Sequence, residues 1–237
     1  MNYFSTILFV WSELFTSRLI FMPRKTAFIV TTLLFCCWIG GYGQTDWELK
    51  TEKEGIKVYT KTFPDSKFKA IRVDLDLQAT LSQLVAVLMD VNTGAEWVYA
   101  TKTSVLLKQV SPNELVYYSE VKLPWPVANR DFIAQLRATQ DAKTKVVTID
   151  GPVVPDFVPV KEGIVRVTRS VGKWVITPLG PHHVKITYTL RLDPGGDLPA
   201  WLFNLFVTKG PTESFKNLKA QLKKPAYENA RLPYIVD

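Results

Sequence analysis

Short segments in which apolar and polar residues alternate fill most of the chain after Gly55. Ala70 to Leu77 shows the pattern most clearly, because every second side chain in it is apolar. Successive side chains of a β-strand point to opposite faces, so this alternation is typical of a strand with one buried face. Turn-forming residues separate the segments from one another. The sequence therefore predicts strands at residues 56–60, 70–77, 104–110, 115–123, 131–139, 145–150, 164–170, 172–178 and 183–192.

Two further segments have the spacing of helices. Thr80 is a suitable N-cap, and the apolar residues after it recur at helical spacing as far as residues 92–94. A longer helix is predicted from Pro199 onward, with a kink at Gly210-Pro211 because proline removes a main-chain donor. A strongly twisted antiparallel sheet around the final helix would bury the apolar faces of both. We therefore expect an α+β fold.

A rigid aromatic loop precedes one of the predicted strands. Pro124 and Pro126 flank Trp125, and the loop runs into the charged pair Arg130-Asp131. Each proline fixes φ and lacks an N–H, so the loop is not expected inside a sheet and the indole is expected near the surface. Amphipathic rings favour a membrane interface. We therefore expect Trp125 to act as a gate or as a membrane contact, and the Arg130-Asp131 pair to form an ion pair where the strand begins.

This loop and strand, with Gly172 to Pro178 and Asp193 to Leu202, resemble the START family of lipid-binding domains. The resemblance extends from about Trp47 to about Leu222. It implies the helix-grip fold, in which a twisted antiparallel sheet surrounds a long C-terminal helix. It also implies an internal cavity that holds a lipid.

The resemblance further implies a role for Arg137. In START domains, the arginine at this place in an RDF-x4-R pattern projects into the lipid cavity, and here the pattern spans Arg130 to Arg137. An arginine in an apolar cavity needs an anionic partner or a polar ligand end, because an uncompensated buried charge is unstable. Glu120 and Asp131 are the candidate partners within the chain. A solvated position for Arg137 on the strand surface remains the alternative.

A lipid carrier needs a large apolar enclosure and only a few orienting polar groups. A 16-carbon chain that enters such an enclosure gains about 12 kcal/mol, at about 0.8 kcal/mol per methylene. Alternation does not say which face of each strand points inward, so the candidates come from both faces. The candidate wall residues from the strands are Val73, Leu75, Val105, Leu107, Tyr118, Ile133, Trp174, Ile176, Ile186 and Tyr188, and those from the final helix are Trp201, Leu205 and Phe206.

No catalytic or metal-binding motif stands out. His182 and His183 are the only histidines, and they lie at a turn without an evident third partner for metal ligation or base catalysis. We therefore expect a protein that carries or senses a lipid without catalysis, cofactor or metal. Two alternatives remain open. One is an enzyme of the polyketide cyclase, aromatase or hydrolase type on the same fold, and the other is an interaction protein whose cavity is filled by its own side chains.

Residues 1–43 differ sharply from the rest, because they are apolar and almost free of acidic groups. From Met22, basic residues, an apolar run over residues 26–39 and a small-residue stretch ending at Gly43 have the form of a secretory signal. We therefore expect an N-terminal targeting segment at 1–43, with the signal peptide at 22–43, ahead of a START-like domain at 44–237. This predicts secretion or a periplasmic location, or membrane anchoring if the signal is not cleaved.

The charge of the chain favours anionic partners. Its net charge is +7, and removal of residues 1–43 leaves +5. Such a balance suits a negatively charged membrane surface. Nucleic acid is disfavoured because no basic cluster is interleaved with aromatic residues. The expected partners are a lipid of the sterol, phospholipid or fatty acid class and, transiently, a membrane surface, with the protein acting as a monomer.

Overall fold

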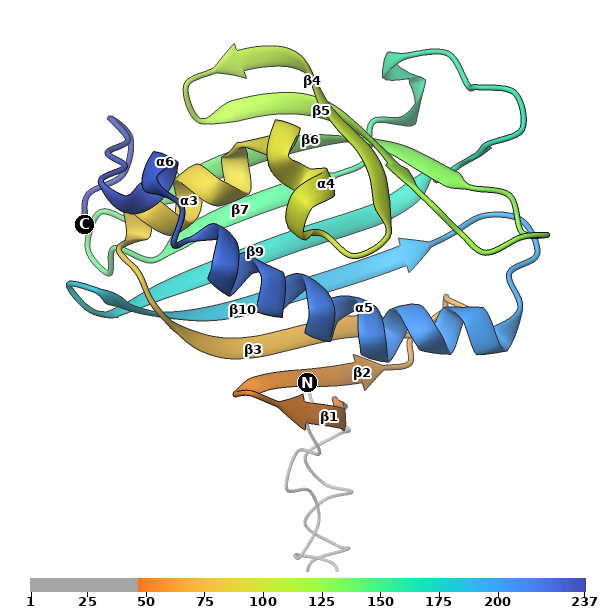
Figure 1. Cartoon of the computed structure of the whole chain (residues 1–237), viewed down its shortest axis with the longest axis horizontal. Coiled ribbons are helices and arrows are strands. Elements are labelled where there is room, and N and C mark those ends of the chain that lie inside the picture. Colours follow the sequence, from red (N-terminus) through yellow and green to blue (C-terminus); the bar gives the residue numbers. More distant parts are fainter. Residues whose placement is uncertain (1–46) are drawn as a thin grey trace, which may run out of the picture. The chain divides into compact units, whose positions relative to one another are not determined.

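One sheet of ten strands forms the framework of the domain (Figure 1). The computed structural model describes residues 47–237, apart from the side chains of residues 200, 201, 204 and 205, so the predicted targeting segment at 1–43 lies outside the described residues. In spatial order the strands are β1 (Glu48–Lys53), β2 (Ile56–Lys61), β3 (Ala70–Gln78), β10 (His183–Asp193), β9 (Arg169–Gly180), β7 (Val147–Pro152), β6 (Arg130–Gln140), β5 (Glu114–Val121) and β4 (Thr101–Ser111). Neighbours along this path are antiparallel, and the short β8 (Val165–Arg166) pairs parallel with β6.

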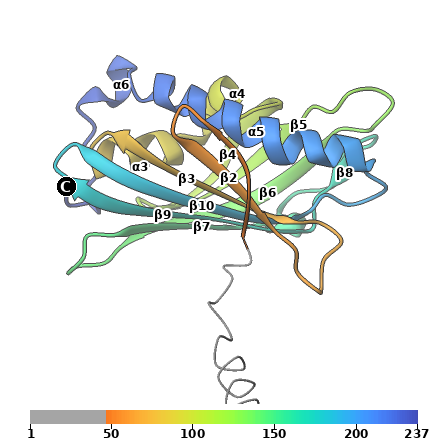
Figure 2. The same ribbon diagram turned by 90° about the horizontal axis from the view of Figure 1, so that it is seen from below.

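The helices gather on one face of this sheet (Figure 2). They are α3 (Leu81–Met89), α4 (Gly94–Trp97), α5 (Ala200–Gln221) and α6 (Pro225–Glu228), with short 3₁₀ turns at Val91–Thr93 and Pro155–Phe157. The long α5 contacts β1, β2 and β3 on one side and α4 on the other. Within residues 47–237, we find no helix whose length and apolar character would let it cross a membrane.

The sequence-based fold class is confirmed, since a large antiparallel sheet surrounds a long C-terminal helix. Thr80 caps α3 as expected, because its side-chain oxygen accepts a hydrogen bond from the Gln83 amide at 3.1 Å. The final helix continues as one element through Pro211, where a kink was expected.

Two strand predictions need correction. The segment 164–170 was expected to form one strand, but only Val165–Arg166 pairs with β6, and Arg169 already begins β9. The reason lies in the pairing of β9 with β10, which begins where Arg169 lies opposite Asp193. Arg169 and Ser170 therefore belong to the same strand as the next predicted segment, 172–178. Strand β1 was not predicted, and its side chains are mostly exposed, so it lacks the alternation that identifies a strand.

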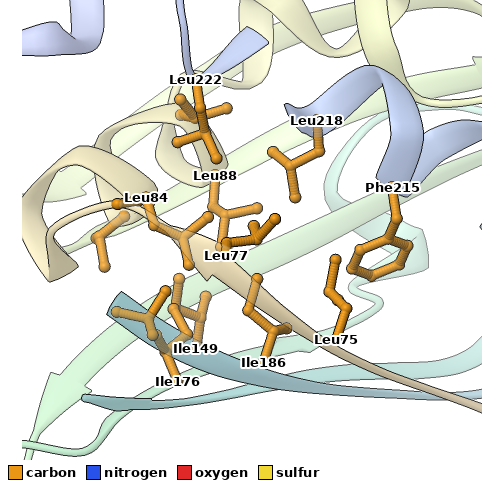
Figure 3. Packing of buried hydrophobic residues seen from close by; sticks show 14 of the residues in the cluster. Leu75, Leu77, Leu84, Leu88, Ile149, Ile176, Ile186, Phe215, Leu218 and Leu222 are labelled. Carbon is orange, nitrogen blue, oxygen red and sulfur yellow. The ribbon is translucent and has the colours of Figure 1, made fainter. Parts of the chain in front are cut away.

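One end of the space between sheet and helices is filled with aliphatic side chains. Leu84 from α3 and Leu218 from α5 are fully buried there, against Ile149, Ile176 and Ile186 of β7, β9 and β10 (Figure 3). Helical spacing of apolar residues in α3 provides one side of this contact and strand alternation provides the other. This packed end anchors the C-terminal half of α5.

Candidate functional site

The other end of the same space is a cavity of about 340 Å³. The N-terminal half of α5 covers it through Phe203, Phe206, Val207 and Gly210, and the inner face of the sheet forms its floor. On the floor, β5 contributes Tyr117, Ser119 and Val121, β6 contributes Arg130, Phe132, Ala134 and Leu136, β9 contributes Ser170, Gly172 and Trp174, and β10 contributes Tyr188, Leu190 and Leu192. The lining is therefore mainly apolar, with a small number of polar groups.

Three aromatic rings separate the cavity from the packed end. The ring centroids of Trp174 and Tyr188 lie 4.4 Å apart, and Phe215 of α5 lies 5.3 Å from Trp174. Such tilted contacts stabilise aromatic clusters beyond simple burial. The rings thus form an aromatic wall between the cavity and part of the packed core, while Leu88 of α3 borders both.

Small residues keep the floor of the cavity open. At Gly151 of β7, an added Cβ would lie 2.8 Å from Cδ2 of Leu136, which is too close for a real side chain. At Gly172 of β9, an added Cβ would lie 3.4 Å from the hydroxyl oxygen of Tyr188. Both glycines therefore let larger neighbours lie flat against the sheet.

Two phenols contribute hydroxyl groups to this apolar lining. Tyr117 and Tyr188 both line the cavity, and neither hydroxyl has a hydrogen-bond partner among the residues that the structure describes. Burial raises the pKa of Tyr188 to about 12 and raises the pKa of Tyr117 further. Both phenols are therefore neutral at physiological pH and can donate a hydrogen bond to a ligand.

Arg130 is the cationic residue of the lining, and it lies at the cavity end farthest from the packed core. Its side chain is buried, with 5% of the residue exposed. Nη1 donates to the Ala128 carbonyl at 2.5 Å and Nη2 donates to the Gly195 carbonyl at 3.3 Å, while the buried Nε has no partner among the described residues. Burial lowers the pKa of this guanidinium.

The expected ion pair between Arg130 and Asp131 does not form. Neighbouring strand residues point to opposite faces, so Asp131 lies behind the sheet, where it is fully buried against Arg166. Nε and Nη2 of Arg166 donate to the two carboxylate oxygens at 2.7 and 3.1 Å. Arg166 also donates to the carbonyls of Pro155, Val158 and Pro159, and so ties the 153–164 loop to β6.

The structure also corrects the orientation expected for Arg137. This side chain is 60% exposed on the outer face and pairs with Glu114, with 2.8 Å between Nη2 and Oε2. Because strand residues alternate with a period of two, Leu136 and not Arg137 shares the inner face with Arg130. Arg137 therefore does not project into the cavity.

Glu120, expected as a partner of Arg137, also points outward. Its carboxylate accepts from Lys102 Nζ and from Asn129 Nδ2, both at 2.8 Å. The hydrogen bond from Lys102 lowers the pKa of Glu120, and the bond from Asn129 acts in the same direction. Since Asn129 precedes Arg130, Glu120 helps to hold the loop that enters β6.

The remaining wall candidates divide between four locations. Trp174, Tyr188 and Phe206 do line the cavity. Tyr118 and Ile133 do not, because they form a separate outer-face cluster with Val116, and Lys161 lies 4.0 Å above the Tyr118 ring. Ile176 faces inward but lies in the packed core, as do Val73, Leu75 and Ile186. Val105 and Leu107 of β4 are exposed. The side chains of Trp201 and Leu205 lie outside the described residues.

Trp125 occupies the tip of the loop between β5 and β6, where it is 93% exposed. Leu123, two residues earlier, lines the cavity, so the loop connects the cavity wall with the surface. On the neighbouring 153–164 loop, Phe157 and Val160 are also exposed. The two loops are held together where the Val165 amide donates to the Asn129 carbonyl at 2.9 Å.

Sequence reasoning missed Arg130, Phe132 and Tyr117 as lining residues. Alternation divided β6 into two candidate faces, and the face that carries Arg130 is the inner one. A signal was available, since Phe132, Ala134 and Leu136 form the uninterrupted apolar face of that strand. In the described part of the chain, no three His, Cys, Asp or Glu side chains are placed to hold a metal ion.

Comparison with known proteins gives consistent matches over this domain. The START domain family model matches residues 42–227. An uncharacterized protein of Pseudomonas aeruginosa is 33% identical over 185 residues, which cover 76% of this chain and 88% of the relative. The phosphatidylcholine transfer protein of Bos taurus is 29% identical over 178 residues, which cover 73% of this chain and 82% of the relative.

A solved structure has the same fold. The STAR-related lipid transfer protein of Xanthomonas axonopodis, a fragment of residues 25–204, superposes with a TM-score of 0.69 at 32% identity. The match covers 76% of this chain and 99% of that fragment. The family model spans the sheet, the cavity and α5, and two bacterial relatives exceed 30% identity. The chain therefore belongs to the START domain family.

Proposed function

We propose that the protein binds an amphiphilic lipid in this cavity and carries it between membrane surfaces without changing it chemically. The cavity itself carries the proposal. A volume of 340 Å³ falls within the range of about 300 to 1,000 Å³ typical of small-molecule sites. The names of the bovine and Xanthomonas relatives, both lipid transfer proteins, support it.

The chemistry of the lining supports carriage over catalysis. Its walls are mainly aliphatic and aromatic, and its polar groups are the guanidinium of Arg130, several hydroxyls and the carboxylate of Asp90, which accepts a hydrogen bond from Tyr227. Burial of a 16-carbon chain there supplies about 12 kcal/mol at about 0.8 kcal/mol per methylene. Tight binding therefore needs no covalent step.

The exposed loops at the hollow end suit a membrane contact. Trp125, Phe157 and Val160 are exposed apolar residues on two adjacent loops, and the basic residues Lys122 and Lys161 accompany them. Aromatic rings favour the interfacial region, and basic residues favour anionic head groups. We propose that these loops touch the membrane while the lipid passes beneath the N-terminal half of α5, and that Trp125 acts as the gate or contact.

The N-terminal segment bears on where this would happen. We propose that residues 1–43 direct the chain out of the cytoplasm, and that the domain acts as a monomer in the periplasm or outside the cell. Fractionation of the producing cells, followed by N-terminal sequencing of the exported protein, tests this. A mature chain that starts at Gln44 is expected, and an uncleaved chain confined to the cytoplasm would contradict it.

The central experiment is identification of bound lipid by native mass spectrometry of the purified protein, followed by transfer of labelled lipid between donor and acceptor vesicles. Ala134→Phe places a ring in the cavity and should abolish both lipid retention and transfer. Val105→Phe adds a similar ring on the exposed face of β4 and should leave both unchanged. Absence of bound lipid and of transfer in the unmodified protein, or equal transfer by Ala134→Phe, would contradict the proposal.

A further inference from the structure

The lining has one cationic end. Arg130 stands at the first residue of β6, and the strand then runs through Phe132, Ala134 and Leu136 toward the aromatic wall. A ligand that fills the cavity would thus meet a guanidinium at one end and Trp174, Tyr188 and Phe215 at the other. The site has the polarity of an amphiphile, with a charged head and an apolar tail.

The charge of Arg130 has no counter-charge among residues 47–237. A guanidinium has five N–H donors, and only two protein acceptors, both main-chain carbonyls, are used here. The buried Nε–H has no acceptor in the part of the chain that the structure describes. Buried charges are normally paired and hydrogen-bonded, so this arrangement leaves a place for an anion.

Four carboxylates on neighbouring elements are already engaged elsewhere. Asp131 pairs with Arg166 behind the sheet, and Glu120 pairs with Lys102 on the outer face. Asp193, at the end of β10, pairs with Arg169 and accepts from the Gly195 amide. Asp90, which also lines the cavity, accepts from the Tyr227 hydroxyl at 2.8 Å.

We propose that the ligand of this cavity is an anionic amphiphile whose acidic head group pairs with Arg130, while its hydrocarbon chain extends to the aromatic wall. The inference rests on the proposed lipid-binding function and adds the class of lipid. A carboxylate or a phosphate would serve, since guanidinium groups recognise both as charge-assisted hydrogen-bond acceptors. The unpartnered hydroxyls of Tyr117 and Tyr188 lie along the path of the chain and add neutral donors.

Matched pairs of lipids test the head-group preference with the full chain. Palmitic acid is compared with hexadecanol, and phosphatidic acid with the corresponding diacylglycerol. Each lipid is titrated into protein that holds the same fluorescent lipid probe, and displacement of the probe gives the affinity. We expect at least one acid to bind about 10- to 100-fold more tightly than its neutral partner, as a charge-assisted hydrogen bond supplies. The pair that shows the preference identifies the source as a carboxylate or a phosphate.

Two variants of one strand localise the effect. Arg130→Gln should reduce the acid-to-neutral affinity ratio to near 1 while the neutral lipid still binds. Arg137→Gln removes an arginine from the outer face of the same strand and should leave the ratio unchanged, because that side chain is 60% exposed and pairs with Glu114. If Arg130→Gln does not fold, as judged by circular dichroism, the ratios in the unmodified protein still decide the question.

The outcomes separate this inference from the proposed function. Equal affinity for the acid and neutral members of both pairs would refute the anionic head group but leave lipid carriage intact. Failure of all four lipids to bind would count against both. A ratio that persists in Arg130→Gln and disappears in Arg137→Gln would also overturn the assignment.

Discussion

The packed end and the hollow end of this domain are built from the same strands, yet one is solid and the other open. In β9, Trp174 lines the cavity and Ile176, two residues later, lies in the core. In β10, Tyr188 lines the cavity and Ile186 lies in the core. The difference arises on the helical side, because α3 fills the packed end with Leu84 and its neighbours. A cavity here therefore comes from what covers the sheet and not from a change in the sheet itself.

The two halves of α5 repeat this contrast within one helix. Leu218 and Leu222 of its C-terminal half are buried among aliphatic side chains (Figure 3). Phe203 and Phe206 of its N-terminal half are only partly buried and face the cavity. A side chain that faces a void has fewer atoms to contact, so it contributes less dispersion energy. Phe203 and Phe206 thus contribute less to the attachment of α5 than Leu218 and Leu222 do.

The largest expected effect tests this difference between the halves of α5. Leu218→Ala should lower the free energy of unfolding by about 4 kcal/mol, because it leaves a cavity in close-packed surroundings. Phe206→Ala removes more atoms but should lower the free energy of unfolding by less than about 2 kcal/mol, because the ring already borders a cavity and is partly exposed. Urea unfolding measures both, and equal losses would show that the two halves are equally well packed.

A buried ion pair stabilises the hollow end where hydrophobic packing is thin. Asp131→Asn should lower the free energy of unfolding by about 3 kcal/mol, because it leaves Arg166 buried without a counter-charge. Asp65→Asn removes the partner of Arg191 in an exposed ion pair and should change the free energy of unfolding by less than about 1 kcal/mol. Thermal unfolding of the two variants makes the comparison. A small effect at Asp131 would mean that the ion pair does not hold this end together.

The smallest effect concerns Glu120, which supports the loop at the hollow end and has a lowered pKa. A carboxylate whose pKa is lower when folded stabilises the protein above its ordinary pKa of 4.5, and this stabilisation is lost as pH falls through the folded value. Glu120→Gln should therefore destabilise the protein near neutral pH, and the difference should shrink at pH values below 4.5. Melting curves across this range measure the difference. Glu162→Gln, on an exposed loop, serves as the control, and a pH-independent loss at Glu120 would contradict the explanation.

The two faces of β6 show how far sequence reasoning reached. Alternation predicted the strand nearly to its ends, since Asp131 to Thr139 was expected and Arg130–Gln140 is found. Alternation alone left both faces open, because Ile133 is as apolar as Phe132 and each face carries an arginine, and the more apolar face of Phe132, Ala134 and Leu136 was not taken as the deciding signal. Ile133 is fully buried as well, but in a separate cluster behind the sheet. A second apolar layer on the outer face thus made the strand ambiguous.

The sequence by itself determined most of the strands, the two main helices, the cap of α3 and the membership of the family, because these depend on local periodicity and on residue types along the chain. Only the tertiary structure decided which arginine lies in the cavity, which of the inward residues meet α3 and which meet empty space, and which carboxylates are already paired. Those properties depend on contacts between residues far apart in the chain. No local pattern encodes the distance between a strand and the helix that covers it.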